Sequence, residues 1–504
     1  MSTPIEHVVV LMLENRSFDH LFAYSGIPNI AAVDTSKTNP GTDGSVAMSA
    51  SAADPLSTDP NHEFEDVDWQ LYRSPRNGAA RTISMSGFVD RSGPVAMQCV
   101  PPDNLKVLTQ LAREYLVCDH WFSSLPGPTW PNRFFVHAGS SGGLANSPGD
   151  LTTIGSLSSS ELGFSFDHNT LYEALEAAGR TWRVYHGDHF PQVCAIDTMP
   201  SVFVASVDKF RSIDELAADA HSGDMADYTF IEPNYSILTS FKSGDSQHPR
   251  GTLAKGEDLI RAVYDAVSDP AIWAKTLLII TYDEHGGFYD QMIPPAAPPP
   301  GDAALNAQKA KTPPNPPFAF DQFGVRVPAV IVSPWVKPKT VSPVTYDHTT
   351  VIKTVFELFG LQGRLTARDA AAASLKPLID GTQQMLAPIA LDPAPLAAAP
   401  LAAAPLAAAQ LATAADPDAG GEDTSSLDGF TRIAAQVHHA LNNYQPGMQP
   451  HELHAVAASS PQLDALPGLP TAGGKLASRA YIAQVAAMVE THRQGLRALS
   501  PKRS

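Results

Sequence analysis

Several short apolar runs, each ending abruptly in polar residues, are the feature that most constrains how this chain can fold. They lie at residues 7–13, 115–117, 182–185, 229–231, 277–281 and 327–332. A strand with one face in water alternates apolar and polar residues, whereas a near-continuous apolar strand is covered on both faces. The runs therefore predict a buried sheet.

Segments with helix-like apolar spacing lie between these runs, at 169–178, 255–267 and 349–358. Strands that alternate with helices are typical of a doubly wound α/β domain with a mostly parallel sheet. In such sheets the chemistry collects beyond the carboxyl ends of the strands. The run HVVVLMLEN ends at Glu14 and Asn15, and LLIITYDEHGG continues to Asp283 and Glu284. We expect the two acidic strand ends to be able to share one metal ion.

The 504 residues exceed the size at which one hydrophobic core usually stops growing, so we expect a catalytic domain, at 1–390, with an appended unit. A stretch at 391–424, which contains PLAAAPLAAAPLAAAQ, cannot bury a continuous core and is predicted to be a linker. Helical apolar spacing predicts a small helical extension at 425–504. The extension carries apolar residues that we expect to pack on the catalytic domain, with a membrane or a partner as the alternative: Tyr481, Val485, Met488 and Val489.

A formal net charge of -18 limits the partners, since it repels both nucleic acid and an anionic bilayer. We therefore expect no nucleic acid partner, while a zwitterionic phospholipid or a small phosphate ester remains admissible, with transient contact to a membrane surface. The N-terminus has neither a basic region nor a small-residue cleavage site, which favours a cytoplasmic protein, with secretion by a signal-free route left open. The oligomeric state is not predicted.

The polar residues after the runs suit phosphoryl chemistry, which needs a nucleophile, positive charge to stabilise the equatorial oxygens and an acid to protonate the departing alkoxide. A hard divalent cation held by Glu14, Asn15, Asp283 and Glu284 would supply charge and lower the pKa of a bound hydroxyl. Thr129, in SSLPGPTWPNRFF, is the candidate hydroxyl, because glycine and proline fix a turn before a helix-like run. Taken alone, these residues also fit a polar strand end, a solvated turn and an ordinary loop threonine.

A series of separated motifs resembles, in the same order, those of the phosphoesterase family that contains bacterial phospholipases C and acid phosphatases. The motifs are ENRSFDH at 14–20, PTWPNR at 128–133, SQHP at 246–249, YDEHGGFYD at 282–290 and the stretch at 327–360. The resemblance implies a fold similar to the alkaline phosphatase superfamily. It implies that Thr129 is both nucleophile and metal ligand, and that Glu14, Asn15, Asp283 and Glu284 complete the metal site. Asn15 can instead contact a substrate oxygen.

The resemblance also places histidines around the phosphate. In order of preference, the matches in this chain are His248, His62 and His186. A histidine there can protonate the leaving oxygen and later help to activate water, because an ordinary pKa of about 6.5 suits both tasks.

Three functions follow from these expectations. The first is a metal-dependent phospholipase C that cleaves glycerophospholipids to diacylglycerol and a phosphorylated headgroup through a phosphorylated Thr129. The second is an acid phosphatase-type phosphomonoesterase that uses the same residues. The third is a non-catalytic interaction protein that retains the fold. The expected cofactor is one divalent metal ion, and calcium, magnesium and manganese all suit oxygen ligands.

Overall fold

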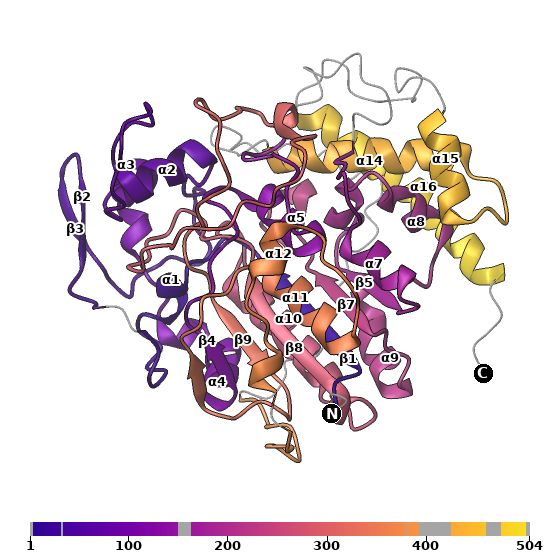
Figure 1. Ribbon diagram of the computed structural model, residues 1–504, viewed down its shortest axis with the longest axis horizontal. Coiled ribbons are helices and arrows are strands. Elements are labelled where there is room, and N and C mark those ends of the chain that lie inside the picture. Colours follow the sequence, from indigo (N-terminus) through magenta and orange to yellow (C-terminus); the bar gives the residue numbers. More distant parts are fainter. Residues whose placement is uncertain are drawn as a thin grey trace.

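An eight-stranded sheet forms the centre of the protein (Figure 1). The structure is a computed structural model that describes residues 4–31, 34–149, 163–379, 381–392, 425–459 and 475–499. The strand order is β10, β4, β9, β8, β1, β7, β5, β6. The strands are β1 His7–Leu13, β4 Leu116–Cys118, β5 Trp182–His186, β6 Phe210–Ser212, β7 Tyr228–Glu232, β8 Thr276–Tyr282, β9 Ala329–Val332 and β10 Thr340–Ser342.

The sheet is mostly parallel, and only β9 runs antiparallel to its neighbours β4 and β8. Strands β7 and β8 are buried at every residue, and β1 at every residue after His7. Because successive side chains point to opposite faces, continuous burial means that both faces are covered. The predicted α/β fold with a mostly parallel sheet is confirmed. The edge strands β6 and β10 were not predicted, because each has only three residues, of which one is apolar.

Two groups of helices pack around the sheet. Helix α10 contacts β1 and β8, and α4 and α9 lie against α10. In the second group, α5 contacts both α7 and α11. Helices α7, α10 and α11 occupy the segments for which apolar spacing predicted helices. The helices in these groups are α4 Lys106–Glu114, α9 Leu216–Ser222, α10 Leu253–Val267, α5 Thr129–Ala138, α7 Leu171–Ala177 and α11 Thr349–Phe359, and α12 Ala367–Ala371 contacts α11.

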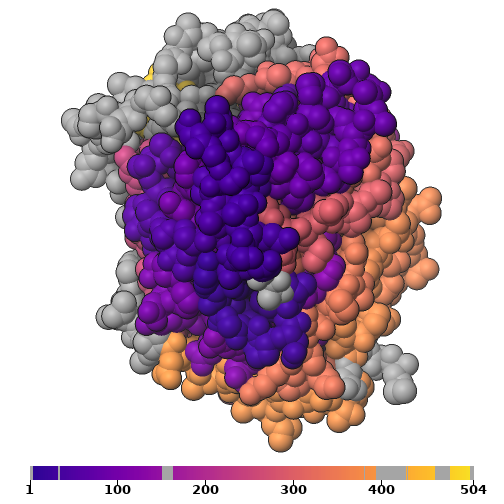
Figure 2. All heavy atoms as spheres, turned by 90° about the vertical axis from the view of Figure 1, so that its left-hand side faces the viewer, coloured from indigo at the N-terminus to yellow at the C-terminus, as the bar shows by residue number. Residues whose placement is uncertain are grey.

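A small lobe with its own hydrophobic cluster lies at the left of Figure 1. It contains the antiparallel pair of β2 (Thr38–Gly41) and β3 (Gly44–Ala47), with α2 (Phe64–Tyr72) and α3 (Phe88–Ser92). Figure 2 shows these early segments, in indigo and purple, spread over one face of the molecule beside later segments in salmon and orange. The hydrophobic cluster of this lobe includes Tyr289, so the lobe packs against the segment that follows β8.

The C-terminal helices α14 (Ser425–Asn443), α15 (Pro450–Ser459) and α16 (Lys475–Leu499) form the predicted helical extension. They pack on one another and on α8 (Met199–Ala205), at the upper right of Figure 1. Three of the four apolar residues considered for a membrane contact are buried, namely Tyr481, Val485 and Val489, while Met488 is exposed. Of the predicted linker, residues 393–424 lie outside the described residues. Within the described part of the chain, no helix has the length and hydrophobicity needed to cross a membrane.

Candidate active site

The carboxyl ends of β1 and β8 lie side by side, because Leu13 and Tyr282 are partners in the parallel register of these strands. The backbone N–H of Asn15 donates to Asp283 Oδ1 at 3.0 Å. Asn15 has a φ of 57°, which turns the chain sharply out of β1. Asn15 and the two acidic residues after β8 are buried. The two polar strand ends predicted from the sequence therefore form one buried group.

The Asp283 carboxylate has hydrogen bonds on both oxygens. Oδ1 accepts from the backbone N–H groups of Asn15 and Glu284, at 3.0 and 2.7 Å. Oδ2 accepts from Arg133 Nε at 3.0 Å, in an ion pair whose side chains are 3% and 0% exposed. The other end of the Arg133 guanidinium donates to the carbonyl of Leu13 at 3.2 Å. Asp283 thus holds the β1 turn and helix α5 in place, a role that sequence reasoning, which made it a metal ligand, did not anticipate.

Thr129 is the first residue of α5, and Pro128 precedes it in an extended conformation. Asn132 fixes the turn before the helix, since its side-chain amide donates to the carbonyls of Gly127 and Pro128 and its oxygen accepts from the Leu125 N–H. The start of a helix presents free N–H groups and a positive dipole end, which favour an anion. The chain therefore places a hydroxyl where a phosphoryl group would be stabilised.

A chain of two hydrogen bonds joins this hydroxyl to a histidine. Thr129 Oγ1 donates to Asn15 Oδ1 at 3.2 Å, and Asn15 Nδ2 donates to His62 Nε2 at 3.2 Å. His62 Nδ1 lies 2.6 Å from the Pro60 carbonyl oxygen, which can only accept, so the ring proton is on Nδ1. Nε2 of His62 thus faces the group at the strand ends, where it contacts Asn15.

Two glutamates of the group have buried oxygens without a hydrogen-bond partner among the described residues, namely Glu14 Oε2 and Glu284 Oε1. Burial raises the pKa of Glu14 to about 7, against the opposing effect of His248 and Arg133. Burial likewise raises the pKa of Glu284 to about 8, although His62 opposes it. Buried carboxylates without compensating charge are costly, and a divalent cation would supply that charge through oxygen ligands. The donor set fits the metal ion that the motifs imply.

His248 belongs to the same group. It stacks on Phe241, with 3.8 Å between ring centroids, and its Nδ1 accepts from the Arg250 N–H at 3.3 Å. Its Nε2 lies 3.3 Å from Asp59 Oδ2, close enough for an ion pair. Burial acts to raise the pKa of Asp59, but His248 and His62 outweigh it, so that the pKa is lowered. Asp59 Oδ1 is a further buried oxygen without a hydrogen-bond partner in the described part of the chain.

The structure does not bring His186 into this group. Its Nδ1 lies 2.7 Å from the carbonyl oxygen of Asp188, and its ring packs edge-on against Phe203. Burial lowers the pKa of His186 to about 3, and the charged groups that act on it include Arg493 and Arg497 of α16. A neutral histidine beside the C-terminal helices is placed for packing, and it takes no part in the chemistry proposed below.

Two residues of the group were missed by sequence reasoning. Arg133 is the last residue of the PTWPNR motif, in which only the hydroxyl of Thr129 was considered, so its ion pair with Asp283 was not predicted. Asp59 comes three residues before His62 in DPNHEF, and an acidic residue beside a candidate histidine was the available signal. Two other histidines hold the acidic pair: His348 Nε2 lies 2.6 Å from the Asp283 carbonyl oxygen, and His285 Nδ1 lies 3.2 Å from Glu284 Oε2.

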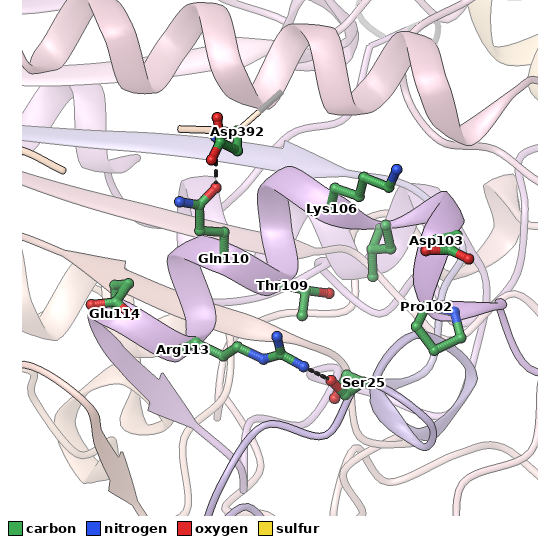
Figure 3. A pocket seen from close by; sticks show the side chains of 10 residues that line it. Ser25, Pro102, Asp103, Lys106, Thr109, Gln110, Arg113, Glu114 and Asp392 are labelled. Carbon is green, nitrogen blue, oxygen red and sulfur yellow. Dashed lines mark hydrogen bonds between the residues drawn. The ribbon is translucent and has the colours of Figure 1, made fainter. Parts of the chain in front are cut away.

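A surface pocket of about 680 Å³ lies elsewhere, against α4 (Figure 3). Its wall includes Lys106, Gln110 and Arg113 of that helix, and Gln110 accepts from the Asp392 N–H at 2.9 Å. None of the residues at the ends of β1 and β8 lines it. The pocket has no nucleophile paired with a base, so the chemistry of the chain points to the strand ends.

The model of the Phosphoesterase family matches residues 5–362. Non-specific phospholipase C3 of Arabidopsis thaliana is 31% identical over 420 residues, which cover 76% of this chain and 74% of that protein. Non-specific phospholipase C6 of the same plant is 32% identical over 399 residues, with coverage of 75% and 72%. Phospholipase C B of Mycobacterium tuberculosis is 27% identical over 423 residues, with coverage of 74% and 77%. The family is therefore represented in both plants and bacteria.

Among solved structures, a protein of the alkaline phosphatase superfamily from Vibrio parahaemolyticus is similar at a TM-score of 0.32 and 14% identity, over 54% of this chain and 65% of that one. A likeness of this size decides nothing about the chemistry. The residues matched by the family model include the strand ends, Thr129 and both histidines of the site. The chain therefore belongs to the Phosphoesterase family of hydrolases and is homologous to the non-specific phospholipases C.

Proposed function

We propose that this protein is a phospholipase C, which cleaves glycerophospholipids to diacylglycerol and a phosphorylated headgroup with Thr129 as nucleophile. The observation that carries the proposal is the buried group in which the Thr129 hydroxyl, at a helix N-terminus, is hydrogen-bonded to Asn15 beside Glu14 and Glu284. The homology to plant and bacterial phospholipases C supports a phospholipid as substrate. Transient contact with a membrane surface is part of the proposal, because such a substrate resides in a bilayer.

A single divalent metal ion is part of the proposal. Glu14, Glu284, Asn15 Oδ1 and the Thr129 hydroxyl would hold it, with Asp283 as a further carboxylate in reach of the same strand ends. When bound, the ion would supply positive charge to the phosphate oxygens and lower the pKa of the Thr129 hydroxyl. Calcium, magnesium and manganese all remain compatible with these oxygen donors.

The chain's own residues then perform a two-step displacement. Thr129 Oγ1 attacks phosphorus, the bond between phosphorus and the diacylglycerol oxygen breaks, and the headgroup phosphate is left bonded to Thr129. Water attacks the same phosphorus in the second step, releases the phosphorylated headgroup and restores the hydroxyl. The N-terminal amides of α5 would stabilise the negative charge in both steps. Asn15 would orient the nucleophile through its Oδ1.

The proton for the departing alkoxide would come from His248 or His62. His248 Nε2 lies 3.3 Å from the Asp59 carboxylate, which would stabilise the protonated ring that an acid requires. His62 presents the lone pair of Nε2 to Asn15, so it is suited to accept a proton before it can give one. This difference favours His248 as the acid of the first step and His62 as the base that later activates water.

Hydrolysis of p-nitrophenyl phosphorylcholine and of p-nitrophenyl phosphate, each with and without chelator, tests the proposed function. We expect diester turnover that the chelator abolishes, a loss of at least about 10³-fold in Thr129→Ala, and near-normal turnover in Thr129→Ser, which keeps a hydroxyl. Turnover of the monoester alone would replace the proposal by a phosphomonoesterase. Undiminished turnover in a folded Thr129→Ala would exclude Thr129 as the nucleophile.

A change of leaving group identifies the acid. p-Nitrophenolate departs without a proton, whereas the diacylglycerol alkoxide needs one. We expect His248→Gln to lose at least about 10²-fold more activity on phosphatidylcholine than on p-nitrophenyl phosphorylcholine, and His62→Gln to lose similar activity on both. The reverse pattern would exchange the two roles.

A further inference from the structure

A second cluster of possible metal ligands lies outside the active site. It consists of Asp167, His168 and Asp302, whose ligand atoms all lie within 4.8 Å of one another. Asp167 and His168 precede α7, and Asp302 belongs to the proline-rich segment that follows β8. The same two segments are joined nearby, since Asn306 Nδ2 donates to the carbonyl of Ser165 at 3.0 Å. The cluster therefore sits where two segments distant in sequence are held together.

The hydrogen bonds of His168 leave one ring nitrogen prepared for a ligand. Nδ1 lies 3.0 Å from the Asn169 carbonyl oxygen, which can only accept, so Nδ1 carries the proton. A backbone carbonyl on Nδ1 is the partner that commonly fixes a metal-binding histidine with its Nε2 lone pair free. His168 Nε2 is buried and has no hydrogen-bond partner in the described part of the chain.

Asp302 provides the independent observation. Its side chain is 9% exposed, and its Oδ2 is also buried without a hydrogen-bond partner among the described residues. His168 Nε2 and Asp302 Oδ2 face each other at 3.7 Å, which is too long for a hydrogen bond. One ion bonded to both atoms at about 2.1 Å spans such a separation. Two buried acceptors that face each other need either a proton or a cation between them.

We propose that His168, Asp302 and Asp167 form a site for a divalent transition metal ion of the zinc type. One imidazole nitrogen and two carboxylate oxygens are donors that zinc accepts, and exposed Asp167 would leave a coordination position to water. Asp167 is already oriented, because its Oδ2 accepts from the Ala303 N–H at 3.0 Å. The ion would fasten the proline-rich segment to the residues before α7 and takes no part in the proposed ester cleavage.

The alternative is an ion pair without metal. Burial acts to lower the pKa of His168, but Asp302 and the Asn169 carbonyl outweigh it, so that the pKa is raised. A protonated His168 would then face Asp302 directly. The two arrangements respond differently to added metal, because only the first binds an equivalent of zinc that depends on His168 and Asp302.

The test uses the untagged full-length protein after removal of metal with a chelator. Zinc is titrated by calorimetry, and the change in Tm on adding zinc is measured in parallel. We expect His168→Gln and Asp302→Asn each to bind one equivalent less than wild type, or to bind that equivalent at least about tenfold more weakly. Both variants should keep p-nitrophenyl ester hydrolysis, since neither residue belongs to the active site.

His221→Gln is the matched control. His221 Nδ1 lies 2.9 Å from Asp269 in an exposed histidine–aspartate pair, so its loss should leave the zinc stoichiometry unchanged. Equal stoichiometry and affinity in wild type and His168→Gln would overturn the proposal and leave an ion pair only. Should Asp302→Asn fail to fold, His168→Gln decides the question, because its amide can replace the ring without introducing a buried charge.

Discussion

The ion pair between Arg133 and Asp283 can be tested without any assay of activity, through Asp283→Asn. The asparagine keeps Oδ1 for the N–H groups of Asn15 and Glu284, but it sets an amide NH2 against Arg133 Nε, 3.0 Å away in the wild type. Both partners are buried, so the change leaves a guanidinium without its nearest anion. Removing one partner of a buried pair costs about 3–5 kcal/mol.

Other charged groups around the Arg133 guanidinium reduce the expected loss of unfolding free energy to the lower end of this range. Burial acts to lower the pKa of Arg133, but Tyr235, Asp283, Glu14 and Glu232 outweigh it and raise the pKa. Two carboxylates thus remain near Arg133 after Asp283 is neutralised. We expect Asp283→Asn to lower the free energy of unfolding of the metal-free protein by about 3 kcal/mol.

Guanidinium unfolding followed by tryptophan fluorescence, in the presence of chelator, measures this loss. A double-mutant cycle with Arg133→Met should give a coupling energy of at least about 2 kcal/mol. Asp90→Asn is the control, because its pair with Arg73, 2.8 Å long, is partly exposed and should contribute less than about 1 kcal/mol. A loss of stability below about 1 kcal/mol in the metal-free protein would refute the positioning role of Asp283.

Two further predictions concern other parts of the site. A Cβ at Gly286, whose φ is +63°, would overlap the carbonyl group of Asn15, so Gly286→Ala should reduce ester hydrolysis by at least about 10²-fold while its circular dichroism spectrum stays native. Gly360→Ala is the control, because Gly360 has a similar φ of +70° but open space around it, and this variant should keep its activity. Equal activity in the two variants would contradict the clash. Burial raises the pKa of Asp245 from 3.8 to about 8, so its contribution to stability is fully present below about pH 4 and is lost as the pH rises through 8. Tm should therefore fall more steeply between pH 5 and pH 9 in wild type than in Asp245→Asn. Parallel curves of Tm against pH would count against a protonated Asp245.

The C-terminal extension is connected to the active site through aromatic contacts. Phe430 of α14 packs edge-on against Trp130, the residue after Thr129, with 5.7 Å between ring centroids, and it also lies against Tyr235. Arg133 is positioned over the same Tyr235 ring at 5.1 Å. Helix α14 thus packs against the first turn of α5 through Trp130, so the extension helps to position Thr129.

The sequence by itself determined the sheet and the polar residues at its edge. Apolar runs bury both faces of a strand whatever the rest of the chain does, so β1 and β8 and the residues after them, Asn15 and Glu284 among them, could be placed from local pattern alone. The glycine and proline residues before Thr129 likewise fix the turn locally, so the turn could be predicted from a few neighbouring residues. Family motifs then connected these separate segments into one expected site.

Tertiary structure alone decided which partners the side chains have. Asp283 lies next to Glu284 in sequence, yet its oxygens are held by Asn15 and Arg133, whereas Glu284 Oε1 is buried without a hydrogen-bond partner among the described residues. His186 ends strand β5, but its ring packs against Phe203 of α8 and does not join the group at the ends of β1 and β8. Hydrogen bonds and burial depend on atoms from segments more than a hundred residues apart, and no local pattern records which of them meet.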